Sequence, residues 1–137
     1  MEKAAFTLVK YSFDKVIIDY SLKSGQEIRI QFKPNGFFKK TEEKSFYNLT
    51  FNFIAISNKE ENPFVDIECN TLFEFAHPIT FEEIPSFFYA NSIAIIFPYL
   101  RAFVSTVTLQ ANKEPIVLPT MNLSSLEKDL RDNTIEK

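Results

Sequence analysis

Apolar and polar residues alternate along much of the first half of the chain. Between Phe64 and Phe75 the apolar side chains share one parity, and the acidic and amide side chains share the other. This pattern predicts a strand with one buried face and one solvated face. The segment 45–57 alternates in the same way, and the polar stretch 58–63 between the two is typical of a hairpin loop.

Two more strands are predicted upstream. The segment 26–33 alternates up to a Pro-Asn-Gly turn signature at 34–36, which we expect to end the strand. The segment 6–22 changes its apolar parity at residues 14–15, which predicts a bulge that re-aims the strand. The sequence therefore predicts four antiparallel strands, at about 6–22, 26–33, 45–57 and 64–75.

The second half of the chain has helical spacing instead. Apolar residues recur at helical intervals over about 81–110, and Pro98 is expected to kink or split this helix. A short amphipathic helix is predicted at 124–133, and the residues after it are expected to fray. No linker separates a second domain, so we expect a single α+β domain over 1–137. Its four-stranded antiparallel sheet would be followed by a long kinked helix and a short C-terminal helix.

The composition narrows the functional classes. The chain of 137 residues contains sixteen Phe and five Tyr but no Trp, with only two Gly, one Cys and a net charge of −3. Two isolated glycines cannot form a phosphate-binding loop, and one Cys cannot form an internal disulfide or a Cys-based zinc site. Mild acidity argues against a nucleic-acid partner. We therefore expect no cofactor, no metal and no nucleic acid, whereas some of the many aromatic rings are candidates for contact with a partner.

One segment is long and nearly uncharged. Arg101 is the only charged residue over 84–112, and it must form an ion pair or reach a polar edge. Pro98 and several polar residues interrupt the segment, so we expect a helix buried in the core or at a subunit interface rather than membrane insertion. The N-terminus lacks the continuous apolar stretch of a signal peptide, and we expect a cytoplasmic protein.

Candidate catalytic chemistry is sparse. His77 is the only imidazole, and Cys69 falls on the buried parity of its strand, so neither indicates a nucleophilic site and we expect no enzyme. Asp66 and Glu68 share the solvated face of one strand, where they are either ordinary surface charges or a docking face for a basic partner. Of the adjacent aromatic residues at 37–38, one is expected to be exposed, for loop packing or for an apolar ligand or peptide.

Two segments of the second half resemble a known family. The sequence Asn-Ser-Ile-Ala-Ile-Ile-Phe-Pro-Tyr-Leu-Arg-Ala at 91–102 resembles the long-helix signature of the SecB protein-export chaperone family. The sequence Pro-Ile-Val-Leu-Pro-Thr-Met-Asn-Leu at 115–123 resembles that family's helix-connecting loop and the entry to its last helix. The close match covers about a quarter of the chain, and the order of strands, long helix, loop and short helix fits the rest.

The resemblance implies a dimer of dimers in which the long helices lie between two sheets. It also implies ATP-independent binding of non-native polypeptides in hydrophobic grooves, with delivery to the SecA motor in the export members. SecA docking would involve Asp19 and Asp66, with Glu68 beside them. Groove residues would be Phe32, Ile116, Leu118, Leu123, Leu126 and Leu130. The adjacent aromatic residues Phe37 and Phe38, which lie outside the predicted core, are added to them as candidates for contact with a client. The oligomer interface would include Ile95, Pro98, Tyr99, Arg101 and Phe103.

The chain departs from the family pattern in two places. The stretch 23–26 between the first two strands is shorter than in the family and lacks its Trp, and the C-terminal tail is short. We therefore expect a divergent SecB-like holdase, serving either general export or a single client such as those paired with toxin–antitoxin systems. The alternative is a binding protein for a lipid or hydrophobic metabolite, and an enzyme using carboxylates in an apolar pocket is the third hypothesis.

Overall fold

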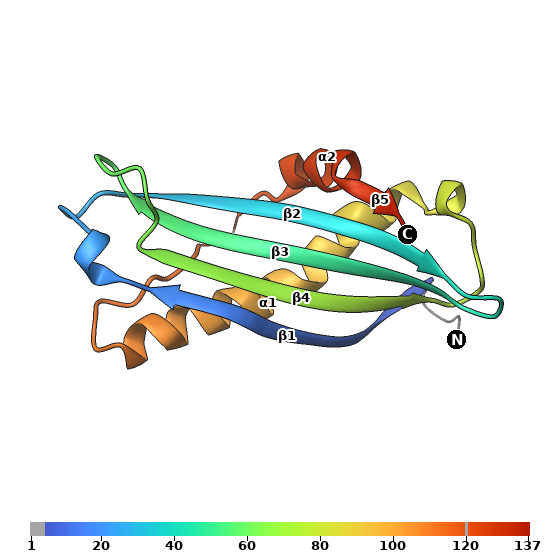
Figure 1. Cartoon of the computed structure of the whole chain (residues 1–137), viewed down its shortest axis with the longest axis horizontal. Helices are drawn as coiled ribbons and strands as arrows, with labels where there is room; N and C mark the ends of the chain where they lie inside the picture. The colour runs from blue at the N-terminus through green and yellow to red at the C-terminus, as the bar shows by residue number, and fades with distance from the viewer. Residues whose placement is uncertain (1–4, 120) are drawn as a thin grey trace.

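The chain forms one long sheet with a helix laid across one of its faces. The structure is a computed structural model and describes residues 5–119 and 121–137. In Figure 1 the sheet faces the viewer, α1 crosses behind it, and α2 lies on the β2 side of the sheet. The elements are β1 (Phe6–Ile18), a 3-10 helix (Tyr20–Leu22), β2 (Ile28–Lys40), β3 (Ser45–Ser57), β4 (Val65–Phe75), a second 3-10 helix (Phe81–Glu83), α1 (Ser86–Gln110), α2 (Ser124–Asp132) and β5 (Thr134–Glu136).

The number of strands and the direction of one strand pair differ from the prediction. The sheet has five strands in the order β1-β4-β3-β2-β5. β1 pairs with β4, β4 with β3 and β3 with β2, all antiparallel, whereas β5 pairs with β2 in the parallel direction. The prediction of a four-stranded, purely antiparallel sheet is therefore wrong, while the α+β class, the long helix and the short C-terminal helix are confirmed. The error arises at the C-terminus, since residues expected to fray pair with β2 instead.

The predicted bulge in the first strand is confirmed. The pairing of β1 with β4 shifts its register between Phe13 and Lys15, where the apolar parity changes in the sequence. β1 ends at Ile18, earlier than predicted, because the next residues form the 3-10 helix Tyr20–Leu22 with Asp19 as its N-cap residue. The bulge lets one strand present Phe13 to the helix layer and still continue along β4.

β2 continues well past its predicted end. The expectation that a Pro-Asn-Gly turn closes this strand is wrong, because β2 runs to Lys40 in continuous register with β3. Gly36 donates its N–H to the carbonyl of Asn133, so the even-numbered residues of β2 turn their backbone groups away from β3. Pro34 has the same parity. Its missing N–H therefore leaves the β2–β3 hydrogen bonds intact, which is how a strand tolerates proline at an edge.

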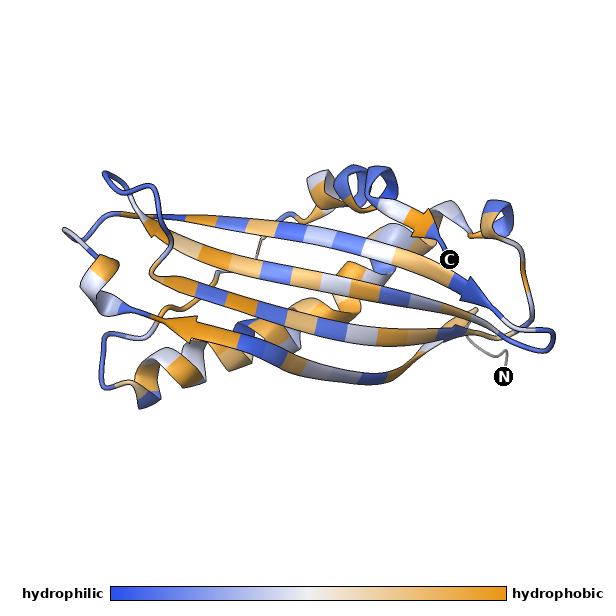
Figure 2. Ribbon diagram, in the orientation of Figure 1, coloured by the Kyte–Doolittle hydropathy of each residue, from blue (hydrophilic) through white to orange (hydrophobic). Residues whose placement is uncertain are grey.

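Aromatic side chains fill the space between the sheet and α1. The ring centroid of Phe88 lies 4.6 Å from that of Tyr47, 4.7 Å from Phe6 and 5.0 Å from Phe75. Such tilted and edge-to-face pairs contribute about 0.5–1.5 kcal/mol each beyond the burial of their area. Figure 2 shows hydrophobic and hydrophilic residues alternating along the strands. On β3 and β4 the residues of the predicted apolar face are buried, among them Phe51, Phe53, Phe73 and Phe75.

α1 is a single helix that begins later than predicted. It starts at Ser86, because Phe81–Glu83 form a separate 3-10 turn and Pro85 occupies the N-cap position. It continues through Pro98 without a break, so the proline does not split it. α1 is long and apolar enough to cross a membrane, judged by length and composition alone. Core helices of soluble proteins meet the same two criteria. Here one side of the helix packs against the sheet, and this accounts for much of its apolar character.

Candidate functional site

A hollow of about 620 Å³ lies between the start of β2 and the connection from α1 to α2. Its volume falls within the range of ligand sites. It is open to solvent, and the Val117 side chain on its wall is 64% exposed. We call this hollow the β2 groove, and its lining residues are Tyr20, Lys23, Gln26, Ile28, Ile30, Lys113, Glu114, Pro115, Ile116 and Val117.

Two different constraints hold the walls of the β2 groove. Ile28 and Ile30 share one parity of β2, so both side chains point to the helix side of the sheet, where they are half-buried. The opposite wall is the extended chain after α1. It is held by a hydrogen bond from the Ile116 N–H to Thr108 Oγ1 at 2.9 Å and by the fully buried side chain of Leu118. A strand and a tethered loop thus hold the apolar side chains of the two walls apart.

The rim of the β2 groove carries more cations than anions. Lys113 Nζ lies 5.1 Å from the centre of the Tyr20 ring, which is a cation–π contact. Lys23 Nζ donates a hydrogen bond to the carbonyl of Gly25 at 2.7 Å. Glu114 is the only acidic residue in the lining. The groove is therefore locally basic, although the whole chain has a net charge of −3.

Apolar surface continues from the β2 groove toward α2. Phe32 is half-buried, and its ring centroid lies 5.5 Å from that of Phe51 and 5.9 Å from that of Phe97. Leu123 and Leu126 are half-buried and pack against the same core. These side chains extend the apolar surface along the helix side of β2.

The residues predicted to form a polypeptide-binding groove differ in how deeply they are buried. Ile116 is the one that lines the β2 groove itself. Phe37 is half-buried on the opposite face of the sheet, with Lys137 Nζ 4.1 Å from its ring centre. Three of the predicted residues are fully buried in the core, so they support the fold and offer no surface to a partner in this structure: Phe38, Leu118 and Leu130.

Of the ten residues that line the β2 groove, sequence reasoning named only Ile116 and missed the other nine, among them Tyr20, Ile28, Ile30 and Val117. The alternation of Ile28 and Ile30 was visible in the sequence, but it indicated only a buried strand face. Their partial exposure depends on where the connection after α1 runs. No local pattern specifies that path, because it is determined by contacts between distant segments.

The predicted docking residues do not form a uniformly acidic face. Lys15 Nζ lies 3.1 Å from the carboxylate of Asp66, which also accepts a hydrogen bond from Asn52 Nδ2 at 2.9 Å. Glu68 lies on the same strand and the same face as Asp66. Asp19 lies beyond the end of β1, where it caps the 3-10 helix. Asp66 is thus partly neutralised within the fold, and docking of a partner on this face stays a prediction.

Four of the five residues predicted for an oligomer interface lie along an apolar seam between α1 and β1, the exception being Arg101. The Phe103 ring stacks on that of Phe13 with centroids 3.9 Å apart, and the Tyr99 ring lies 4.6 Å from that of Tyr11. Tyr99 and Ile95 remain 44% and 38% exposed. The predicted set lies on the exposed side of α1 or at its margin: Ile95, Pro98, Tyr99, Arg101 and Phe103. Arg101 reaches solvent, one of the two placements expected for it.

The lone histidine and cysteine do not form a reactive site. His77 is exposed after the end of β4, whereas Cys69 is fully buried within β4. Burial raises the pKa of the Cys69 thiol to about 12, so the thiol stays protonated and unreactive near neutral pH. In the part of the chain that the structure describes, no cluster of His, Cys, Asp and Glu could hold a metal ion.

Comparisons with known proteins place the fold. No family model matches the sequence. The SecB-like chaperone Rv1957 of Mycobacterium tuberculosis, solved in complex with a ChAD peptide from the HigA1 antitoxin, superposes with a TM-score of 0.58 at 14% identity. The alignment covers 86% of this chain and 91% of that one. The chain therefore has a SecB-like fold.

Two other proteins are similar to parts or most of the chain. An uncharacterized protein, MJ0357, of Methanocaldococcus jannaschii is 37% identical over 51 residues. That match spans 37% of this chain and 33% of the relative, so the chain matches about a third of that protein. A Streptococcus agalactiae protein of unknown function gives a TM-score of 0.49 at 11% identity, over 84% of this chain and 97% of that one.

Proposed function

We propose that this protein is a polypeptide-binding chaperone of the SecB-like type. It would hold non-native chains without ATP and without chemistry of its own. The observation that carries the proposal is the β2 groove, an open hollow in which the apolar side chains of Ile28, Ile30, Ile116 and Val117 lie within a polar and charged rim. A fold neighbour that is itself a SecB-like chaperone bound to an antitoxin peptide supports it. Apolar burial is non-directional and gives about 25 cal/mol per Å², which suits clients of varied sequence.

The proposed function also implies an oligomeric state, a cellular compartment and a partner. We propose a cytoplasmic homo-oligomer, a dimer of dimers, with the seam of α1 and β1 as a subunit interface. The exposed side chains of Tyr99 and Ile95 support this assignment, because an apolar patch on the surface of a monomer usually marks a site of contact with another protein. The proposal is compatible with two roles. The protein could serve protein export and dock to SecA, or it could serve one dedicated client. The ion pair of Lys15 with Asp66 favours the dedicated client, because it neutralises part of the acidic face that a basic partner would need.

The alternative function is a binder of a lipid or hydrophobic metabolite. The volume of the β2 groove would suit such a ligand, but ligand sites of this kind enclose most of the ligand's surface. The groove is open instead, with Val117 64% exposed and with charged residues at its rim. A chain segment passing through an open groove fits this geometry better than an enclosed lipid.

The experiment that tests the proposal is suppression of aggregation. Chemically unfolded citrate synthase is diluted with and without the purified protein, in the absence of nucleotide, and light scattering is followed. We expect the wild-type protein to suppress scattering at stoichiometric ratios and Val117→Glu to suppress it less. The matched control is Ile135→Glu, because Ile135 is also exposed, at 58%, but lies on β5 outside the groove. No suppression by the wild-type protein would overturn the proposal.

A further inference from the structure

The edge of β2 is covered over only part of its length. β5 pairs with Gly36, Phe37 and Phe38. No strand pairs with the stretch from Ile28 to Phe32 on that side within the described part of the chain. Figure 1 shows the same arrangement: β5 and α2 lie along the later half of β2, and its first half forms the free margin of the sheet. The same edge of β2 is therefore paired with β5 in its later part and open in its earlier part.

The backbone groups on the open stretch have a defined direction. The Gly36 N–H donates to Asn133 and the Phe38 carbonyl accepts from the Lys137 N–H, whereas the Glu27 carbonyl accepts from Asn58 on the β3 side. Because β2 keeps one register with β3 throughout, its even-numbered residues point their N–H and C=O groups outward. On the open stretch these outward-pointing residues are Ile28, Ile30 and Phe32. Their backbone groups make no hydrogen bond to a loop of the described residues.

β5 shows that this edge accepts a strand. It is a short extended segment held by backbone hydrogen bonds at 3.2 Å and 2.9 Å, and its exposed Ile135 contributes little burial. Pro34, which carries no N–H, separates the part of the edge that β5 fills from the part that is open. The open part from Ile28 to Phe32 could pair with about five residues of an added strand, roughly 17 Å of chain.

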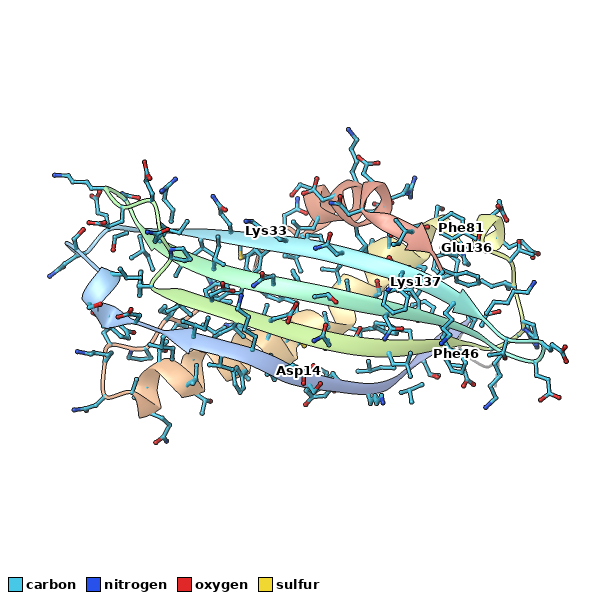
Figure 3. All side chains as sticks on the ribbon, in the orientation of Figure 1. Asp14, Lys33, Phe46, Phe81, Glu136 and Lys137 are labelled. Carbon is cyan, nitrogen blue, oxygen red and sulfur yellow. The ribbon has the colours of Figure 1, made fainter. Side chains whose placement is uncertain are left out.

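The surroundings of the open edge specify the side chains of such a strand. Side chains of an added strand alternate between the two faces of the sheet. On the helix side they would lie beside Ile28 and Ile30 at the mouth of the β2 groove, which favours apolar residues. On the other face they would lie beside Arg29 and Lys33, both exposed and neither in an ion pair among the described residues. Figure 3 labels Lys33 on β2, directly after this stretch.

We propose that the open edge of β2 binds a segment of a partner polypeptide as an added strand, and that it selects segments in which apolar and acidic side chains alternate. The inference rests on the proposed chaperone function and specifies how a client is held. Backbone hydrogen bonds supply affinity that is independent of sequence, and the two rows of side chains supply preference. The cationic rim of Lys23 and Lys113 acts in the same direction, since it attracts acidic segments.

The first test is amide hydrogen exchange of the wild-type protein. The probe is a blocked octapeptide of alternating valine and glutamate. We expect the amides of Ile28, Ile30 and Phe32 to exchange quickly in the free protein and at least about tenfold more slowly with the peptide. The amides of Arg29 and Gln31 serve as internal controls, because they point to β3 and are protected in both states. Binding without protection of the three edge amides would overturn the proposal.

The second test measures peptide affinity by fluorescence anisotropy. A valine–lysine octapeptide should bind at least about tenfold more weakly than the valine–glutamate one. Equal affinity would overturn the acidic preference. Ile30→Pro removes an outward N–H and should weaken binding about tenfold more than Ile30→Ala, which keeps it. Similar losses in the two variants would overturn strand addition. If Ile30→Pro does not fold, valine–glutamate peptides N-methylated at successive residues replace it, and affinity should then fall with a period of two.

A third measurement distinguishes a failure of strand addition from a failure of the proposed chaperone function. Reduced, carboxymethylated lactalbumin is a permanently unfolded probe that tests client binding without regard to its mode. If the wild-type protein binds this probe but the edge amides stay unprotected, the chaperone proposal stands and strand addition fails. If it binds neither this probe nor the octapeptide, the proposed function fails as well.

Discussion

The hydroxyl of Tyr47 on β3 lies 2.6 Å from the hydroxyl of Thr134 on β5. The Thr134 hydroxyl in turn donates to the carbonyl of Leu130 at the end of α2, also at 2.6 Å. The Tyr47 ring reaches β5 by crossing over Gly36, the β2 residue between the two strands. This chain of contacts joins residues far apart in the sequence and holds the C-terminal segment on the sheet.

The first prediction concerns Gly36. A Cβ at this position would collide with the Tyr47 ring and hydroxyl, so Gly36→Ala should lower the free energy of unfolding by about 1–3 kcal/mol or more. Gly25→Ala is the matched control. Gly25 has open space around its Cα but a φ of 69°, so its substitution costs only the strain of that conformation, about 1 kcal/mol. Urea unfolding measures both, and an equal loss would contradict the packing role of Gly36.

The second prediction concerns the hydroxyl of Tyr47. Tyr47→Phe keeps the buried ring but removes the bond to Thr134, which should cost about 1 kcal/mol of stability. Amide exchange at Gly36 and Lys137 should quicken, because both amides bond across the contact between β2 and the C-terminal segment. Thr134→Val should cost more, because it also removes the hydrogen bond to the Leu130 carbonyl and leaves the Tyr47 hydroxyl without its partner. In the double variant the losses should be less than additive. Additive losses would mean that the two hydroxyls act independently.

The third prediction concerns the seam of α1 and β1. If the seam is a subunit interface, Tyr99→Glu should convert an oligomer into smaller species, because it places a charge within buried apolar surface. Light scattering at two protein concentrations measures the mass. Ile135→Glu, equally polar but on β5, should leave the mass unchanged. A wild-type monomer, or an unaltered mass for Tyr99→Glu, would remove the support for this interface.

The fourth prediction concerns alkaline pH. Burial raises the pKa of the Cys69 thiol to about 12 in the folded protein, whereas the thiol of an unfolded chain ionises near pH 8.5–9. Above that range the unfolded state binds fewer protons than the native state, so stability falls as pH rises. Between about pH 8 and about pH 9.5 the wild-type protein should lose about 1 kcal/mol more than Cys69→Ala. Denaturant melts at both pH values measure this difference, and parallel losses would contradict it.

What the sequence alone could determine was local. Alternation from residues 45 to 57 and from 64 to 75 specifies which face of β3 and β4 is buried, since one face of each meets the core along its whole length. The parity change near Asp14 specifies a bulge for the same reason. The spacing of apolar residues also predicts both helices, because each packs one face against the sheet or its neighbour.

Other features were decided only by the tertiary structure. Pro34 and Gly36 indicate a turn locally, yet the first loses only an outward-facing N–H and the second makes room for Tyr47, so β2 continues through both. β5 forms because Thr134 meets Tyr47, a residue that no local pattern connects to it. The β2 groove exists because Thr108 tethers the chain after α1 opposite an incompletely covered strand. Each of these depends on contacts between distant segments, and such contacts leave no periodic signal in the sequence.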